Sequence, residues 1–382
     1  MTATSPALSL TRYRNEFPIF RHTRYLNSCS LGALSERSRT AVTEYLDEWD
    51  RRGAAAWYDS WLPDIERLRD EYARILGSTG QSVSLHPSVS SALAVIGESL
   101  DYRVRPKVVT TSLDFPTVAY QWLAKADRGV RVEVVESPDG TTVPLERLGA
   151  AIDARTALVA TSHVFFTSGA IQDIAALAAL CHANGTFLLI DGYQAVGQLP
   201  VDVDALGVDF YCGGGLKWLM GGSGIAYLYV RPDLQQQLRP GVTGWFAHAA
   251  PFRFDCRNLE RAADAHRFDM GTPSMGAVRA QLAGLSMIEE IGVERICEAT
   301  RTLTEDLIVR AEGHGLRPKV APRPTERSAI VMLPREDPHA DVRRLADRGF
   351  IVDARPGHVR VSPYFYNLAS DHQELLEALT SE

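Results

Sequence analysis

One lysine of this chain lies in an unusual setting for an amine. The 40 cationic residues include only four lysines, which are Lys107, Lys125, Lys217 and Lys319. Lys217 lies in the segment CGGGLKWLMGGSG, where glycines allow close backbone approach. An amine that loses hydration among apolar neighbours has a lowered pKa, which suits a Schiff-base lysine. An exposed lysine on a turn is the alternative. The other three lysines are expected to be solvated.

A carboxylate precedes this lysine at the end of an apolar segment. The segment TFLLID (186–191) has the composition of a buried strand and ends in Asp191. In open α/β sheets the carboxyl ends of the strands face the ligand crevice. A carboxylate there could pair with a protonated pyridine nitrogen and make the ring an electron sink. The alternative is that Asp191 caps a helix.

Two further groups follow other expected strands. In SLHPSVSSALAV, Ser88, Ser90 and Ser91 lie at a strand-to-helix turn. Hydroxyls and free N–H groups at a helix start suit a phosphate, although serines there are also ordinary caps. Phe115 follows the expected strand KVVTTS. Its ring could stack on a flat cofactor or belong to the core.

The surrounding pattern predicts the elements that position these groups. Strands expected at 82–86, 107–112, 130–136, 157–164 and 186–191 alternate with helical segments. Such alternation predicts an α/β fold with a mostly parallel sheet covered on both faces. All four candidate groups then lie at carboxyl ends of strands. A helical stretch at 276–313 and a mixture of short strands and helices after it predict a smaller α+β domain.

Composition excludes several classes of protein. The 382 residues are 45% apolar and 23% charged, with a net charge of −7, so bulk electrostatics do not favour a nucleic-acid partner. The sequence contains no apolar run long enough for a membrane span. Its five cysteines have no paired spacing, which argues against a disulfide scaffold or a zinc site. No signal peptide, G-x-G-x-x-G or P-loop motif is found. We expect a cytoplasmic protein without a metal or a membrane partner.

The chain order of phosphate turn, aromatic ring, carboxylate and lysine resembles that of pyridoxal-phosphate enzymes with the aspartate-aminotransferase fold. In particular, the chain resembles class V aminotransferase-fold enzymes, which include cysteine desulfurases, isopenicillin N epimerase-like proteins and kynureninases. The similarity runs from YLNSCSLGALS (25–35) to VRVSPYFYN (359–367) and is strongest over 161–230. The segments most similar to kynureninases are GWFAH (244–248), RFDMGTPS (267–274) and RPGHVRVSP (355–363).

The resemblance implies roles for individual residues. Lys217 would form the Schiff base with pyridoxal 5'-phosphate, Asp191 would hold the pyridine nitrogen, and Gln194 would lie near the ring hydroxyl. The remaining cofactor contacts would be Phe115 on the ring face, Ser88, Val89 (through its backbone) and Ser90 at the phosphate, and Trp245 and Thr272, often across a dimer interface.

The resemblance also implies a substrate site. Arg360 would grip the α-carboxylate of an amino acid, with Arg355 as the second choice and Asn27 nearby. HVRVS reads as a strand, so alternation places Val359 and Val361 on the core face and leaves Arg360 available to the cleft.

Three departures from the family pattern matter. Phe165 and Phe166 stand where asparagine or tyrosine is common, so the ring hydroxyl is left to Gln194. Gly215 and Leu216 replace the hydroxyl or histidine that often precedes the lysine, so part of the phosphate grip must come from elsewhere. The last cysteine is Cys297, in an expected helix, which argues against a persulfide-forming desulfurase.

These observations predict a class V enzyme that acts on an α-amino acid through a Lys217 Schiff base and a Cα carbanion. Transamination is the leading interpretation. The alternatives are a lyase or kynureninase-like hydrolase that cleaves a bond at Cβ, an epimerase, and a catalytically inactive scaffold. We expect a homodimer with shared active sites. The predicted parts are an N-terminal arm (1–35) that packs with the small domain, a large cofactor-binding domain (36–275) and a small α+β domain (276–382).

Overall fold

A seven-stranded sheet forms the centre of the larger part of the molecule. The structure, a computed structural model, describes residues 10–381. The strand order is β2-β8-β7-β6-β5-β3-β4, and β8 alone runs opposite to the other six strands. The strands are β2 (Val83–His86), β3 (Lys107–Thr111), β4 (Arg131–Val135), β5 (Thr156–Ser162), β6 (Phe187–Asp191), β7 (Phe210–Gly214) and β8 (Ala226–Val230). The predicted mostly parallel α/β fold is confirmed.

The central strands are apolar throughout because helices cover both faces of the sheet. Along β6, Leu188 and Ile190 point into one buried cluster and Leu189 into the other, as the two-residue period of a strand requires. The helices that follow strands β2 to β8 are α4 (Val89–Gly97), α5 (Pro116–Leu123), α6 (Leu145–Ala151), α7 (Ile174–Ala183), α8 (Val203–Leu206) and α9 (Pro232–Gln235). Short 3₁₀ turns, η7 (Trp245–Ala247), η8 (Pro251–Arg253) and η9 (Ala265–Phe268), follow α9.

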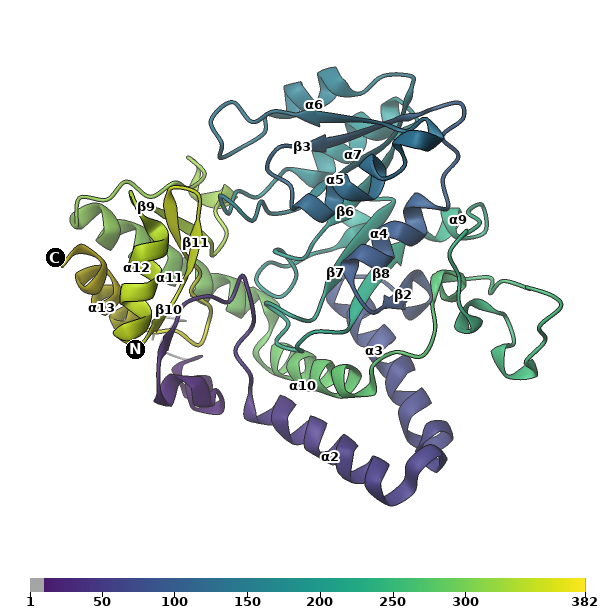
Figure 1. Cartoon of the computed structure of the whole chain (residues 1–382), viewed down its shortest axis with the longest axis horizontal. Helices are drawn as coiled ribbons and strands as arrows, with labels where there is room; N and C mark the ends of the chain where they lie inside the picture. Colours follow the sequence, from purple (N-terminus) through teal and green to yellow (C-terminus); the bar gives the residue numbers. More distant parts are fainter. Residues whose placement is uncertain (1–9, 382) are drawn as a thin grey trace, which may run out of the picture.

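A second, antiparallel sheet lies to one side of the main sheet (Figure 1). Its order is β11-β12-β9. Its strands are β9 (Val331–Pro334), β11 (Asp353–Arg355) and β12 (His358–Val361), and the helices beside it are α11 (Val293–Gly313), α12 (Pro338–Asp347) and α13 (Ala369–Thr380). Val359 and Val361 are buried in the cluster beneath this sheet, as the predicted alternation requires.

Two predicted elements are each divided in the structure. The expected helix 276–313 is instead α10 (Met275–Ile291) and α11, because Gly292 between them adopts a φ of +88° that favours glycine. The expected strand IVDAR is divided into β10 (Phe350–Ile351) and β11. These two short strands have different partners, since β10 pairs with β1 and β11 pairs with β12.

The N-terminal part contributes a strand to a third sheet, which has two strands. Strand β1 (Arg24–Tyr25) pairs with β10 in parallel. Helices α2 (Glu36–Arg52) and α3 (Leu62–Ile75) follow, and the Ser35 side chain caps α2 by accepting a hydrogen bond from the Ser38 N–H. The division into arm, large and small domains stays a prediction. Across residues 10–381, no helix has both the length and the apolar character needed to cross a bilayer.

Candidate active site

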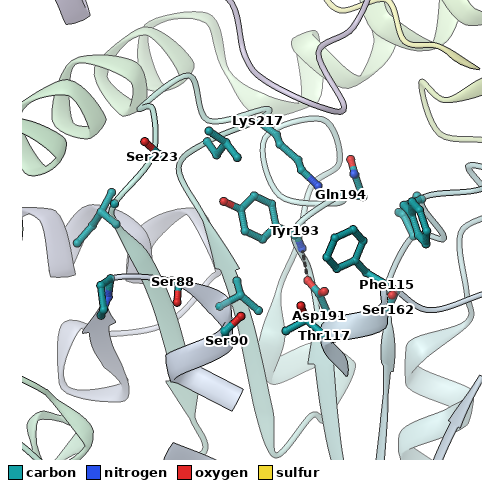
Figure 2. Close-up of a pocket in the computed structure, with 17 residues that line it drawn as sticks. Ser88, Ser90, Phe115, Thr117, Ser162, Asp191, Tyr193, Gln194, Lys217 and Ser223 are labelled. Atoms are coloured by element: carbon teal, nitrogen blue, oxygen red, sulfur yellow. Dashed lines mark hydrogen bonds between the residues drawn. The ribbon is translucent and has the colours of Figure 1, made fainter. Parts of the chain in front are cut away.

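The parallel strands end at one edge of the main sheet, and a cavity of about 340 Å³ lies there. Seven of the residues predicted for the site line this cavity together: Ser88, Val89, Ser90, Phe115, Asp191, Gln194 and Lys217. Figure 2 shows Lys217 and Asp191 on opposite sides of Tyr193, and Ser88 and Ser90 at a different end of the cavity. The predicted convergence of strand ends therefore places a lysine, a carboxylate and a serine turn around one cavity.

Lys217 follows β7 and lies against aromatic rings. Its Nζ is 4.5 Å from the centroid of the Tyr193 ring and 5.9 Å from that of Phe115. Burial lowers the pKa of Lys217 to about 8, and the negative charge of Asp191 only partly opposes this effect. A substantial fraction of the amine is therefore neutral near physiological pH, as a nucleophilic amine requires.

The other lysines have different surroundings. Lys107 pairs with Glu133 and Asp153 at 3.1 and 2.8 Å. Lys125 is 7% exposed, and its Nζ lies 3.0 Å from Glu98. The prediction that all three are solvated is therefore wrong for Lys125, because the opposite charge of Glu98 permits burial of the amine.

Asp191 ends β6 in a buried position. Its Oδ1 accepts a hydrogen bond of 2.9 Å from the Tyr193 N–H. Burial raises the pKa of Asp191, whereas the Tyr193 N–H and the charge of Lys217 lower it. The residues after Asp191 form a loop, and the next helix begins at Val203 with Asp202 as its cap. The helix-cap alternative for Asp191 is therefore wrong.

The serines lie at the start of α4. Ser88 caps this helix, since its Oγ accepts a hydrogen bond of 3.3 Å from the Ser91 N–H. Ser88 and Ser90 are exposed toward the cavity. The capping alternative is thus correct for Ser88, and it is compatible with an anion near the first turn.

Phe115 presents its ring to the cavity. The residue is 46% exposed, so the core alternative is wrong.

Asp114, next to Phe115, was not singled out from the sequence. Its carboxylate accepts hydrogen bonds from the Thr111 N–H at 2.8 Å and the Ser162 N–H at 2.7 Å, which ties the ends of β3 and β5 together. Burial raises the pKa of Asp114 to about 6.

Gln194 lines the cavity with a side chain that already has two partners. Its Nε2 donates to the Cys29 carbonyl at 3.0 Å, and its Oε1 accepts from the Trp218 indole N–H at 2.8 Å. These bonds fix the position of the amide. Phe166, which the family resemblance had placed near the ring hydroxyl, also lines the cavity, and Tyr193 is a large lining residue that the sequence did not assign to the site.

Arg360 was predicted to be available to the cleft, but its side chain does not line the cavity. It is 2% exposed and donates to the Phe166 carbonyl at 3.1 Å, to Ser30 Oγ at 2.6 Å and to Asp353 at 2.9 Å. Arg355 pairs with the same Asp353 oxygen at 2.8 Å. The described residues that line the cavity include neither arginine. The β12 alternation predicted the correct face of the strand but could not predict that Asp353 covers it.

Three other predicted residues lie apart from the cavity lining. Asn27 forms an isolated bridge with Ser362. Trp245 and Thr272 line a separate hollow of about 240 Å³. Its other lining residues are Trp57, Tyr58, Leu62, Phe246, Phe252 and Phe254. None of the described residues that line this hollow also lines the Lys217 cavity. Over residues 10–381, no group of three or more His, Cys, Asp or Glu side chains could hold a metal ion.

Comparison with curated proteins places this arrangement in a family. An uncharacterized aminotransferase of Bacillus subtilis, YcbU, is 32% identical over 375 residues, which cover 97% of each chain. A kynureninase of Shouchella clausii is 26% identical over 97% of this chain and 90% of its own.

Solved structures show the same fold. The apo cysteine desulfurase of Thermococcus onnurineus superimposes with a TM-score of 0.85 at 21% identity, over 96% of both chains. The cystine C-S lyase C-DES, in complex with cysteine persulfide, gives 0.88 at 21% identity, over 96% of this chain and 99% of that one. The aminotransferase class-V profile matches residues 62–373. The chain belongs to the aminotransferase class-V family of pyridoxal-phosphate-dependent enzymes.

Proposed function

We propose that this protein is a pyridoxal-phosphate-dependent enzyme that acts on an α-amino acid, with Lys217 as its Schiff-base lysine and transamination as its reaction. The observation that carries the proposal is that Lys217, Asp191 and the serine turn line one cavity, where burial lowers the pKa of the lysine. Lys217 would react with the aldehyde of the cofactor, Asp191 would bind its protonated ring nitrogen, and the serine turn would bind its phosphate.

The residues around the cavity fit this cofactor. Ser88, Ser90 and the free N–H groups of the first α4 turn would hold the phosphate. Asp191 would accept a hydrogen bond from the ring nitrogen, and the exposed ring of Phe115 would stack on the cofactor. When bound, pyridoxal phosphate supplies an aldehyde that condenses with amines and a ring that accepts the electrons of a Cα–H bond.

The protein groups would act mainly through charge and proton transfer. Lys217 in its neutral form would accept the Cα proton at Nζ, because a base with a pKa near the working pH is the most effective. Asp191 would keep the ring nitrogen protonated, since a nearby negative charge favours the protonated, cationic form of a base. Gln194 would meet the ring hydroxyl from a position fixed by Trp218 and Cys29.

The type of reaction depends on which carbon atom receives the proton that was removed from Cα, and the family name favours transamination. We do not propose persulfide formation, because the last cysteine, Cys297, lies in α11. All five cysteines are unpaired, which supports the cytoplasmic location as a further proposal.

The first test is the Lys217→Ala variant. We expect it to lose turnover, and borohydride should no longer link pyridoxal phosphate to the chain, because the amine that attacks the aldehyde is gone. Lys107→Ala is the control, since Lys107 lies in two ion pairs away from the cavity. Mass spectrometry of products from an amino-acid panel, with and without a keto-acid acceptor, identifies the reaction. A Lys217→Ala protein that still forms the reducible link would contradict the assignment.

The substrate carboxylate is proposed to bind Arg360. Its Nε is buried and has no hydrogen-bond partner within the described residues, and a substrate carboxylate would take the place of Asp353 on the guanidinium. We expect Arg360→Ala to weaken amino-acid binding by roughly 30-fold or more, since removing one partner of a desolvated charge pair costs on the order of 2–5 kcal/mol. Cofactor binding should hardly change. Titration of the holoenzyme with substrate measures the effect. Arg355→Ala should have less effect, and the reverse order of the two variants would make Arg355 the carboxylate site.

A homodimer is proposed because the hollow around Trp245 exposes aromatic rings. Tyr58 is 73%, Phe254 71% and Phe252 45% exposed, and such apolar patches mark interaction sites. Phe254→Asp should shift the protein toward monomers and reduce activity per chain, as measured by light scattering with parallel assays. Val309→Asp on α11, where Val309 is 65% exposed, should change neither. A fully active wild-type monomer at micromolar concentration would rule the dimer out.

A further inference from the structure

The part of the cavity near Ser88 has few polar side chains. Ser88, Ser90 and Ser223 contribute hydroxyls there, and the four residues directly before Lys217 are Gly213, Gly214, Gly215 and Leu216. None of these four has a polar side chain. A doubly charged phosphate is bound well when several charge-assisted hydrogen bonds meet it. A further side-chain donor in this region would therefore strengthen the hold of the serines and the α4 N–H groups on a phosphate.

Tyr193 reaches this region from the loop after β6. Figure 2 shows its ring across the middle of the cavity, with the hydroxyl turned toward the side of Ser88 and Ser223 and away from Phe115 and Asp191. A Cβ built on Gly214 would lie 2.8 Å from the Tyr193 Oη. Glycine at this position thus leaves the space that the hydroxyl occupies, beside the segment that leads to Lys217.

The Tyr193 hydroxyl is a hydrogen-bond donor at neutral pH. Burial raises the pKa of Tyr193, the charge of Asp191 adds to this effect, and the backbone N–H of Leu216 opposes it. The Tyr193 hydroxyl therefore interacts with the backbone N–H of Leu216, the residue directly before the lysine. This is the position where the chain lacks a polar side chain of its own.

We infer that the Tyr193 hydroxyl completes the phosphate site, so that a side chain from the β6 loop replaces the missing polar side chains at residues 215 and 216. This inference rests on the proposed function. Tyr193 would donate to a phosphate oxygen that the α4 turn and the serines hold from the other side. The small side chain of Gly214 is then a condition for this arrangement, because any larger residue would displace the phenol.

The test compares two ligands that differ only in the phosphate. Apoenzyme is titrated with pyridoxal phosphate and with pyridoxal, and dissociation constants are measured for the wild type and for Tyr193→Phe. One lost hydrogen bond to a charged group predicts about tenfold or more weaker binding of pyridoxal phosphate. Pyridoxal binding should change by less than about twofold, because the aromatic ring remains. Tyr120→Phe, at a 63% exposed position on α5, should affect neither ligand.

A second measurement needs no aldehyde. Inorganic phosphate should raise the melting temperature of wild-type and Tyr120→Phe apoenzyme, and should raise that of Tyr193→Phe much less. Equal phosphate protection in all three proteins would overturn the inference, as would equal weakening of both pyridoxal ligands, which would mean that the Tyr193 hydroxyl acts on a part of the cofactor other than the phosphate. A wild type that binds no pyridoxal phosphate would refute the proposed function itself, whereas tight and equal binding by wild type and Tyr193→Phe would refute only this inference.

Discussion

The burial of one amine, that of Lys217, depends on contacts from several parts of this structure. The Lys217 amine lies against aromatic rings, and the charge of Asp191 only partly offsets the cost of burial. The loop that carries it is fixed from two sides. Gly32, which lies shortly before helix α2, donates to the Leu216 carbonyl at 2.9 Å, and the Tyr364 hydroxyl donates to the Trp218 carbonyl at 3.0 Å. Segments from both ends of the chain therefore hold the lysine in place.

Charges beyond the cavity wall act on the same amine. Arg360 and Arg355 both lower the pKa of Lys217, and Asp353 lies between the two guanidinium groups. One carboxylate shared by two arginines leaves an excess of positive charge near the site. That excess keeps the amine more neutral and attracts a carboxylate substrate. The proposed substrate site and the proposed nucleophile are thus coupled electrostatically.

The sequence predicted what depends on local pattern. Strand ends, the glycine run and the scarcity of lysine were enough to bring Lys217, Asp191, Phe115 and the serine turn together. The burial of Lys125 beside Glu98 and the position of Asp353 over Arg360 depend on contacts between distant or edge segments, which periodicity does not report. Tyr193 was missed for a related reason, because a tyrosine next to Asp191 becomes informative only when the space above Gly214 is known.

Burial lowers the pKa of Lys217, and the pH dependence of its chemical modification tests this directly. Apoenzyme is treated with an acylating reagent between pH 6 and pH 11, and peptide mass spectrometry follows Lys217 and Lys107 in the same samples. Burial alone would lower the pKa of Lys107, but its bonds to Asp153 and Glu133 outweigh burial and raise it. Only the neutral amine reacts, so Lys217 modification should rise with a midpoint near pH 8 and then level off, while Lys107 remains slow. A Lys217 midpoint near the ordinary lysine value of 10.5 would contradict the account.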